Sequence, residues 1–177
     1  MPLVLKFLLA VMGLVAIAAA ALMIFGPARI WVLFGPADLG LVAFETLKRR
    51  ATPNDALACP AGLCTARSDR APPVFAVDVN TLRAAMAAIV AGGARIQSVS
   101  ADDAPPTDRY IQRSALLGFP DTIVVRYLAL PEGRSTLAIY SRSQLGRSDL
   151  GVNLARIDRW LARLQRDVPV ADMPSAR

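Results

Sequence analysis

A run of uncharged residues near the N-terminus constrains this chain more than any other feature. Residues 7–25 read FLLAVMGLVAIAAAALMIF and contain no charged side chain. A helix needs about 20 apolar residues to cross the hydrocarbon core of a bilayer, so we expect residues 1–28 to form a membrane anchor that contacts lipid through Phe7–Phe25. The alternative is a cleaved signal peptide, because residues 16–21 contain A-x-A patterns. The apolar stretch of a signal peptide is only about 7–15 residues long, which favours an uncleaved anchor.

The residues that flank this run bear on its orientation. Lys6 precedes the run, and Arg29 is the only basic residue after it before Lys48. Under the positive-inside rule the near flanks favour a cytoplasmic N-terminus and a body on the other side of the membrane, whereas the basic triplet 48–50 favours the reverse. Residues 30–44 are apolar but broken by Gly35-Pro36, so they cannot form a second span. They lie either at the membrane interface or packed against the domain.

Two cysteines lie close together in the sequence CPAGLC, at Cys59 and Cys64. Their spacing is not the C-x-x-C of redox sites, and two cysteines without a histidine cannot complete a four-ligand zinc site within one chain. We predict a structural disulfide, provided that the domain is exported. Two reduced thiols are the alternative.

Composition removes most familiar catalytic chemistry. The chain has 177 residues and no histidine, which excludes histidine general bases, histidine-ligated haem and serine–histidine or cysteine–histidine nucleophile pairs. No other cluster of cysteine, serine or carboxylate groups replaces them. We therefore predict no catalytic residues, no cofactor and no metal, and a protein that is not an enzyme. The net charge of +6 is spread along the chain without interleaved aromatic residues, so we predict no binding of nucleic acid.

Periodicity beyond residue 73 predicts an α+β domain. The fold that we expect is an N-terminal transmembrane helix followed by a curved antiparallel sheet with helices on one face, in the order β-α-β-β-β-β-α. The boundaries are a juxtamembrane segment and irregular lead-in at 29–73, a domain at 74–168 and a tail at 169–177. Residues 102–108 are expected to form a loop. The expected strands and helices are 74–77 (strand), 78–90 (helix), 95–100, 109–115, 122–130 and 135–141 (strands), and 150–167 (helix).

The densest polar motif joins the last predicted strand to the last predicted helix. Free backbone N–H groups at the helix start, together with Arg147, are suited to an anion. The structural alternative is that Ser148 or Asp149 caps the helix while Asn153 and Arg156 hold the loop in place. The candidate residues for interaction or anion binding are Ser141, Ser143, Arg147, Ser148, Asp149, Asn153 and Arg156.

The last predicted helix has an apolar stripe at Leu154, Ile157, Leu161, Leu164 and Val168, spaced three and four residues apart. Arginines repeat with the same spacing on nearly the opposite side. This arginine face suits lipid head groups or an acidic partner, and a plain solvated face is the alternative. Its candidate residues are Arg159, Arg163 and Arg166.

Three segments carry a resemblance to a known family: TPNDALACPAGLC at 52–64, LGFPDTIVVRYL at 117–128 and SRSQLGRSDLGVNLARI at 141–157. On these segments the chain resembles the bacterial family catalogued as domain of unknown function 1499. The resemblance implies a membrane-anchored or exported bacterial protein and no established activity. From the single anchor, the missing catalytic groups and the polar strand-to-helix loop, we expect a single-pass, non-enzymatic accessory or binding protein of the bacterial inner membrane. Its body would be periplasmic, and its protein partner in the membrane would make it a subunit of a larger membrane complex. A small-ligand or lipid-binding module of the cell envelope is the alternative.

Overall fold

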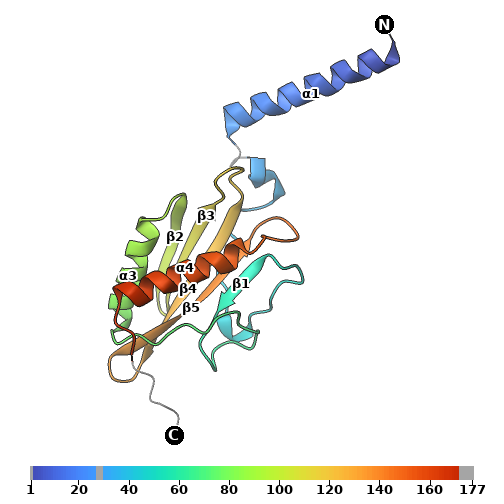
Figure 1. The fold of residues 1–177 in the computed structure, drawn as a ribbon. Helices are drawn as coiled ribbons and strands as arrows, with labels where there is room; N and C mark the ends of the chain where they lie inside the picture. The colour runs from blue at the N-terminus through green and yellow to red at the C-terminus, as the bar shows by residue number, and fades with distance from the viewer. Residues whose placement is uncertain (1, 27–29, 172–177) are drawn as a thin grey trace.

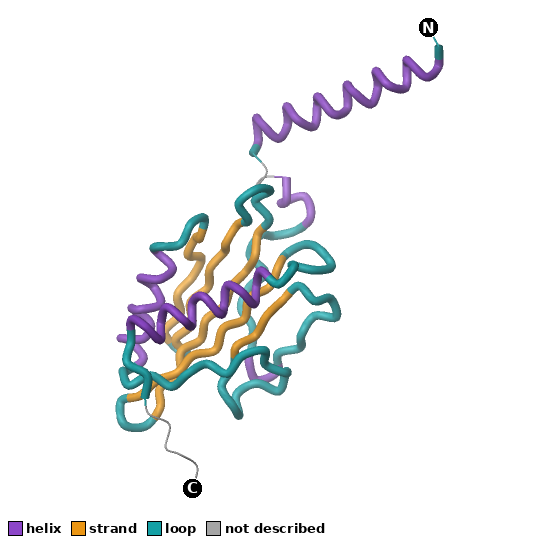
Figure 2. Tube along the Cα trace, in the orientation of Figure 1, coloured by secondary structure: helices purple, strands orange, loops and turns teal. Residues whose placement is uncertain are grey.

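The computed structural model describes residues 2–26 and 30–171 (Figure 1). The chain forms one N-terminal helix and a body in which two helices and a layer of coil enclose an antiparallel sheet (Figure 2). The predicted tail from residue 172 onward lies outside the described residues.

The N-terminal helix α1 spans Leu3–Phe25. Its segment Leu3–Ala21 is long and apolar enough to cross a membrane, and none of that segment is buried against the rest of the protein. An N-terminal signal sequence can also form a helix that meets these criteria of length and composition, so the helix by itself is compatible with both interpretations of the apolar run. In Figure 1 the helix projects away from the body.

The sheet has five antiparallel strands in the order β1-β5-β4-β3-β2. The predicted α+β class and the order β-α-β-β-β-β-α are confirmed, and β3, β4 and β5 form the expected meander. The strands are β1 (Asp55–Ala58), β2 (Ile96–Asp103), β3 (Pro106–Arg113), β4 (Pro120–Leu130) and β5 (Arg134–Ser143).

Two local predictions are wrong. The first strand is not at 74–77 but at β1, inside the segment predicted to be irregular, and Phe75 makes only isolated bridges to Ser135 and Val170. Residues 102–108 are not a loop: β2 and β3 pair through this stretch, from Asp103 opposite Pro106 back to Ile96 opposite Gln112. In both places the pairing partner decides the conformation more than local composition does. The partner of β1 is the distant strand β5, and the partner of β2 is β3, which follows after a tight turn.

Both helices of the body pack on one face of the sheet. Helix α3 (Val79–Ala91) begins at Asp78, whose carboxylate accepts the backbone N–H groups of Asn80 and Thr81. Helix α4 (Val152–Asp167) lies diagonally across the same face in Figure 1. The predicted apolar stripe of α4 is confirmed, since Ile157, Leu161 and Leu164 are buried in the core.

The opposite face is covered by the segment that precedes β1. Phe44 and Leu47, in and beside the short 3-10 helix η2 (Phe44–Thr46), pack against Val124 and Tyr140 of the sheet. This second core explains why the apolar run of β4 shows no alternation: both of its faces are buried. The predicted lead-in is therefore one layer of the folded body.

Hydrogen bonds fasten this layer to the middle of the sheet. Thr122 on β4 accepts the N–H of Leu39 at 3.0 Å through its hydroxyl oxygen and donates to the carbonyl of Ala37 at 3.1 Å. Arg142 on β5 donates to the carbonyls of Leu39 and Gly40 at 2.6 and 2.8 Å.

Cys59 and Cys64 form the predicted disulfide, with their Cα atoms 6.3 Å apart.

Candidate functional site

Four of the predicted interaction residues are buried in one polar network: Ser141, Ser143, Asn153 and Arg156. The guanidinium of Arg156 donates to Ser141 and Asn153 at 2.6 Å each, and to Asp121 at 2.6 Å. It also donates to Gln112 on the neighbouring strand. Arg156 is thus paired with protein atoms on every nitrogen, and the network ties the start of α4 to β3, β4 and β5.

The other predicted residues of this motif lie in the loop between β5 and α4. The carboxylate of Asp149 accepts the N–H groups of Gly151 and Asn153 at 2.9 and 2.8 Å, so it occupies the position that an external anion would take at the helix start. Ser148 accepts the N–H of Leu150 at 3.2 Å. Ser143, which is the last residue of β5, accepts from the Asn153 amide at 3.0 Å. Arg147 is exposed. These contacts support the structural alternative for the motif, except at Arg147.

The predicted arginine face of α4 is exposed along its length. Arg159, Arg163 and Arg166 point away from the sheet, and Arg166 pairs with the adjacent Asp167 at 3.1 Å. The face therefore meets solvent in the described structure. It does not adjoin the motif at Arg156, whose side chain is on the buried side of the same helix.

A groove with a volume of about 660 Å³ lies between α3 and the edge of the sheet. We call it the β2–α3 groove. Alanines 84, 87 and 91 form its wall on α3, and Ile96 and Ser98 line it from β2. The remaining lining residues are Asn80, Arg83, Val90, Asp108 and Tyr110.

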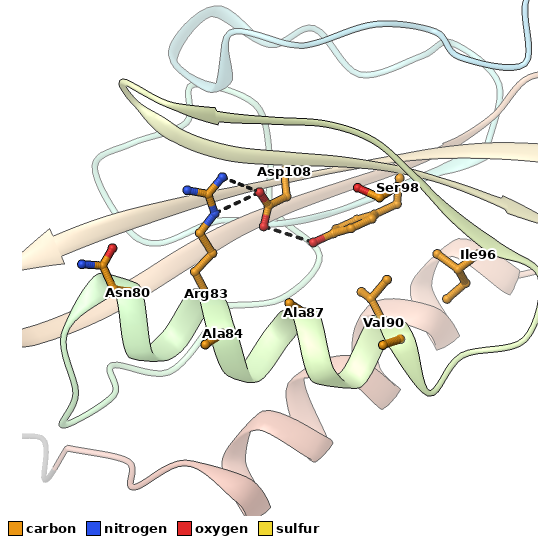
Figure 3. Close-up of a pocket in the computed structure, with 10 residues that line it drawn as sticks. Asn80, Arg83, Ala84, Ala87, Val90, Ile96, Ser98 and Asp108 are labelled. Carbon is orange, nitrogen blue, oxygen red and sulfur yellow. Dashed lines mark hydrogen bonds and ion pairs between the residues drawn. The ribbon is translucent and has the colours of Figure 1, made fainter.

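One end of the β2–α3 groove carries a charged cluster. Figure 3 shows Arg83 of α3 and Asp108 of β3 pointing toward one another across the groove. Arg83 donates to Oδ1 of Asp108 through Nε at 3.0 Å and through Nη2 at 2.7 Å. The hydroxyls of Tyr110 and Tyr127 donate to Oδ2 at 3.1 and 2.9 Å. Four donors therefore fill the acceptor positions of a carboxylate that is only 5% exposed.

The tyrosines in this cluster are held in their neutral form. Burial raises the pKa of Tyr110 above its usual value near 10, and the Asp108 carboxylate raises it further. Burial likewise raises the pKa of Tyr127, with Tyr110 and Asp108 adding to the effect. Both hydroxyls therefore remain hydrogen-bond donors at neutral pH, and the cluster forms a polar end of the groove beside the alanine wall.

The outer edge of β2 borders this groove and pairs with no other strand in the described chain. The opposite edge of the sheet differs: β1 is only four residues long, and its end is bridged by Arg70 and the chain around it. A register shift between Ser98 and Ser100 marks a bulge in β2. Bulges interrupt the regular row of backbone groups at an edge and limit indiscriminate pairing with other strands.

The sequence did not indicate the β2–α3 groove. Arg83 and Asp108 are 25 residues apart and meet only because the β2–β3 hairpin returns beside α3. A partial signal was present, because Asp108 and Tyr110 are two residues apart and therefore share one face of a strand. Reading residues 102–108 as a loop concealed that signal. Among the described residues, no group of three or more cysteine, aspartate or glutamate side chains is suited to hold a metal ion.

Together, these features define a small α+β domain joined to an apolar N-terminal helix, with a groove beside an open sheet edge. The chain belongs to the family described as protein of unknown function (DUF1499), whose model matches residues 53–164. This match confirms the resemblance carried by the three sequence segments. Comparisons with curated proteins and with solved structures found no match to this chain.

Proposed function

We propose that the protein is a membrane-anchored, non-enzymatic binding protein of the bacterial inner membrane, whose periplasmic body binds an extended segment of a partner protein. The observation that carries the proposal is the open edge of β2 beside the β2–α3 groove. An extended peptide that adds to an open edge gains backbone hydrogen bonds from the strand. Its alternate side chains gain specificity from an adjoining groove.

Three features support this location. Helix α1 is long and apolar enough to span a bilayer. The near flanks of the apolar run, with Lys6 before it, favour a body outside the cytoplasm. The disulfide between Cys59 and Cys64 agrees with an oxidising compartment such as the periplasm.

Binding is favoured over catalysis by the state of the charged cluster. Asp108 is the buried carboxylate of the groove, and its acceptor positions are used by Arg83, Tyr110 and Tyr127. A general base needs a free lone pair within reach of the substrate proton. The shallow wall of alanines 84, 87 and 91 instead leaves room for small or medium apolar side chains of a bound segment.

Site-specific photocrosslinking of the full chain in native membranes tests the proposal. A photoreactive residue at Ser98 should yield one discrete crosslinked polypeptide, and the same residue at Gln165, exposed on α4, should not. Ala87→Trp places an indole in the groove from an exposed position and should abolish the crosslink. Ala155→Trp, exposed on α4, is the matched control and should retain it. Retention of the same crosslink in Ala87→Trp would contradict binding in the groove.

A small amphiphile is the second candidate occupant. The groove volume of about 660 Å³ falls within the range of small-molecule sites, and its apolar wall ends at a polar cluster. The space between α4 and the sheet is filled by Ile157, Leu161 and Leu164, so a ligand would bind in the groove and not beneath α4. Native mass spectrometry of the detergent-purified chain should then detect a bound lipid in stoichiometric amount. Ala87→Trp should remove it.

A further inference from the structure

Apolar side chains from three separate segments are exposed on the body. The short 3-10 helix η1 (Trp31–Phe34) exposes Leu33 at 84%. The turn between β3 and β4 exposes Leu116 at 86%, and the loop between β5 and α4 exposes Leu150 at 93%. Val32, Phe34 and Leu117 are exposed beside them. We call these six residues the apolar end. Exposing several large apolar side chains to water costs free energy, so this surface indicates a site that contacts another molecule or a membrane.

The three segments are joined into one surface. The indole of Trp31 donates to the carbonyl of Leu117 at 2.6 Å and packs on the ring of Phe119, with the ring centroids 4.3 Å apart. Phe119 and Leu150 in turn line one hollow of about 320 Å³ at the start of α4. Figure 1 shows η1 and the β3–β4 turn at the end of the body nearest α1. The three segments of the apolar end therefore lie near one another, with a hollow between the β3–β4 turn and the β5–α4 loop.

The length of the connection brings the apolar end to the membrane. Helix α1 ends at Phe25 and η1 begins at Trp31. Five intervening residues reach at most about 20 Å when fully extended, at roughly 3.3–3.6 Å per residue. The head-group region on each side of the hydrocarbon core is itself about 5–8 Å deep. If α1 spans the bilayer, the start of η1 therefore lies within about 20 Å of the end of α1, close enough for η1 to reach the head groups.

The charge beside the apolar end matches a lipid surface. Arg147 is exposed in the same loop as Leu150. The nearby carboxylate of Asp149 accepts two backbone N–H groups at the start of α4, which offsets its charge. Apolar side chains flanked by an arginine are the combination by which peripheral segments enter the boundary between head groups and acyl chains of anionic membranes.

We propose that the body docks on the bilayer through the apolar end, with Leu33, Leu116 and Leu150 inserted among the lipid head groups and Arg147 at the phosphate layer. This inference rests on the proposed function, in which α1 is retained as an anchor. Docking would hold the body in one orientation relative to the bilayer. The β4–β5 turn then points away from the membrane, because β4 is 11 residues long and carries its two ends about 35 Å apart.

Fluorescence of the full chain in nanodiscs tests the docking. The discs contain phosphatidylcholine and phosphatidylglycerol at three to one, and single cysteines at Leu116, Leu150 or Glu132 carry the polarity-sensitive label NBD. The native disulfide is left intact. Glu132 lies in the exposed β4–β5 turn and is the control for the label itself. Labels at 116 and 150 should emit at shorter wavelength than the label at 132, and a lipid quencher at head-group depth should quench them at least twofold more.

Equal emission and equal quenching at all three positions would overturn the docking. A fourth label at Met12 in α1, measured with a quencher deep in the acyl chains, shows independently whether α1 is inserted in the bilayer. Quenching at Met12 without quenching at 116 and 150 refutes the docking and retains the anchor. No quenching at Met12 refutes the anchored protein itself. In discs that insert α1, Arg147→Glu should reduce the quenching at 150, and an unchanged value would refute the role of Arg147.

Discussion

Replacing Arg156 by methionine separates the structural and the anion-binding interpretations of the polar motif. The methionine keeps much of the aliphatic length and removes the guanidinium. The carboxylate of Asp121, buried and paired with Arg156 at 2.6 Å, would then lack its cation. Breaking a buried ion pair from one side costs about 3–5 kcal/mol, because the remaining charge is desolvated without compensation. The free energy of unfolding of Arg156→Met should fall by that amount.

Urea unfolding of the full chain in mild detergent measures this change. The fluorescence of Trp160, buried against Tyr110 in the core, reports the unfolding of the body. A domain of this size has a urea dependence of about 1.5 kcal/mol per molar, so the midpoint should move down by about 2–3 M. Arg159→Met on the exposed side of the same helix is the matched control and should change stability by less than about 0.5 kcal/mol.

A double variant and an added anion complete the experiment. Asp121→Asn in the Arg156→Met background removes the stranded charge, so part of the lost stability should return. Phosphate at 50 mM should leave the midpoint of the wild-type protein equal to that in chloride at the same ionic strength, because Arg156 and the start of α4 already have protein partners. A midpoint for Arg156→Met equal to that of Arg159→Met, or marked protection of the wild type by phosphate, would refute the structural role.

Three further predictions follow from the core and the loops. Burial raises the pKa of every tyrosine in the chain above 10, so the free energy of unfolding should be highest below pH 10 and fall above it. Tyrosinate absorbance should appear in one cooperative step together with loss of circular dichroism. Gradual ionisation of a folded body near pH 10 would contradict this. Gly93→Ala should destabilise the body by about 1 kcal/mol, because an added Cβ would lie 3.1 Å from the backbone oxygen of Val90 and would displace the side chain of Ile96, whose Cδ1 is 2.4 Å away. Gly92→Ala meets ordinary contacts and should be neutral or slightly stabilising in the same unfolding assay. The disulfide constrains only a short loop, so its reduction should increase proteolytic cleavage near residues 60–63 and lower the unfolding midpoint only slightly. Global unfolding on reduction would show that the bond stabilises the whole body.

Elements with strong local signals were predictable from the sequence. The apolar stripe of α4 follows from its spacing, and the β-branched run of β4 identifies a central strand. The strand β1 was not predictable in this way. Its residues, DALA, have low strand propensity, and they are extended because Ala56 and Leu57 pair with Ser141 and Tyr140 on β5. A pairing across 85 residues leaves no trace in a local window.

In the candidate sites, too, local features were predictable from the sequence and long-range contacts were not. The polar motif of residues 141–157 was visible as a dense run of hydrogen-bonding side chains, but its spacing could not reveal that Arg156 faces the sheet and meets Asp121. The β2–α3 groove depends on the approach of β2 to α3, two elements that share no sequence pattern. The apolar end combines loops from three parts of the chain, each of which alone contains one or two unremarkable leucines.

The coil layer on the second face of the sheet determines where the chain can be shortened. A fragment that begins at residue 53, where the family match begins, lacks Phe44 and Leu47 and therefore bares Leu57, Val124 and Tyr140 to water. Such a fragment should aggregate even though every strand is present. A start a few residues before Ala37 keeps the layer and its hydrogen bonds to Thr122 while omitting α1. The smallest soluble unit of this protein is accordingly larger than the region by which its family is recognised.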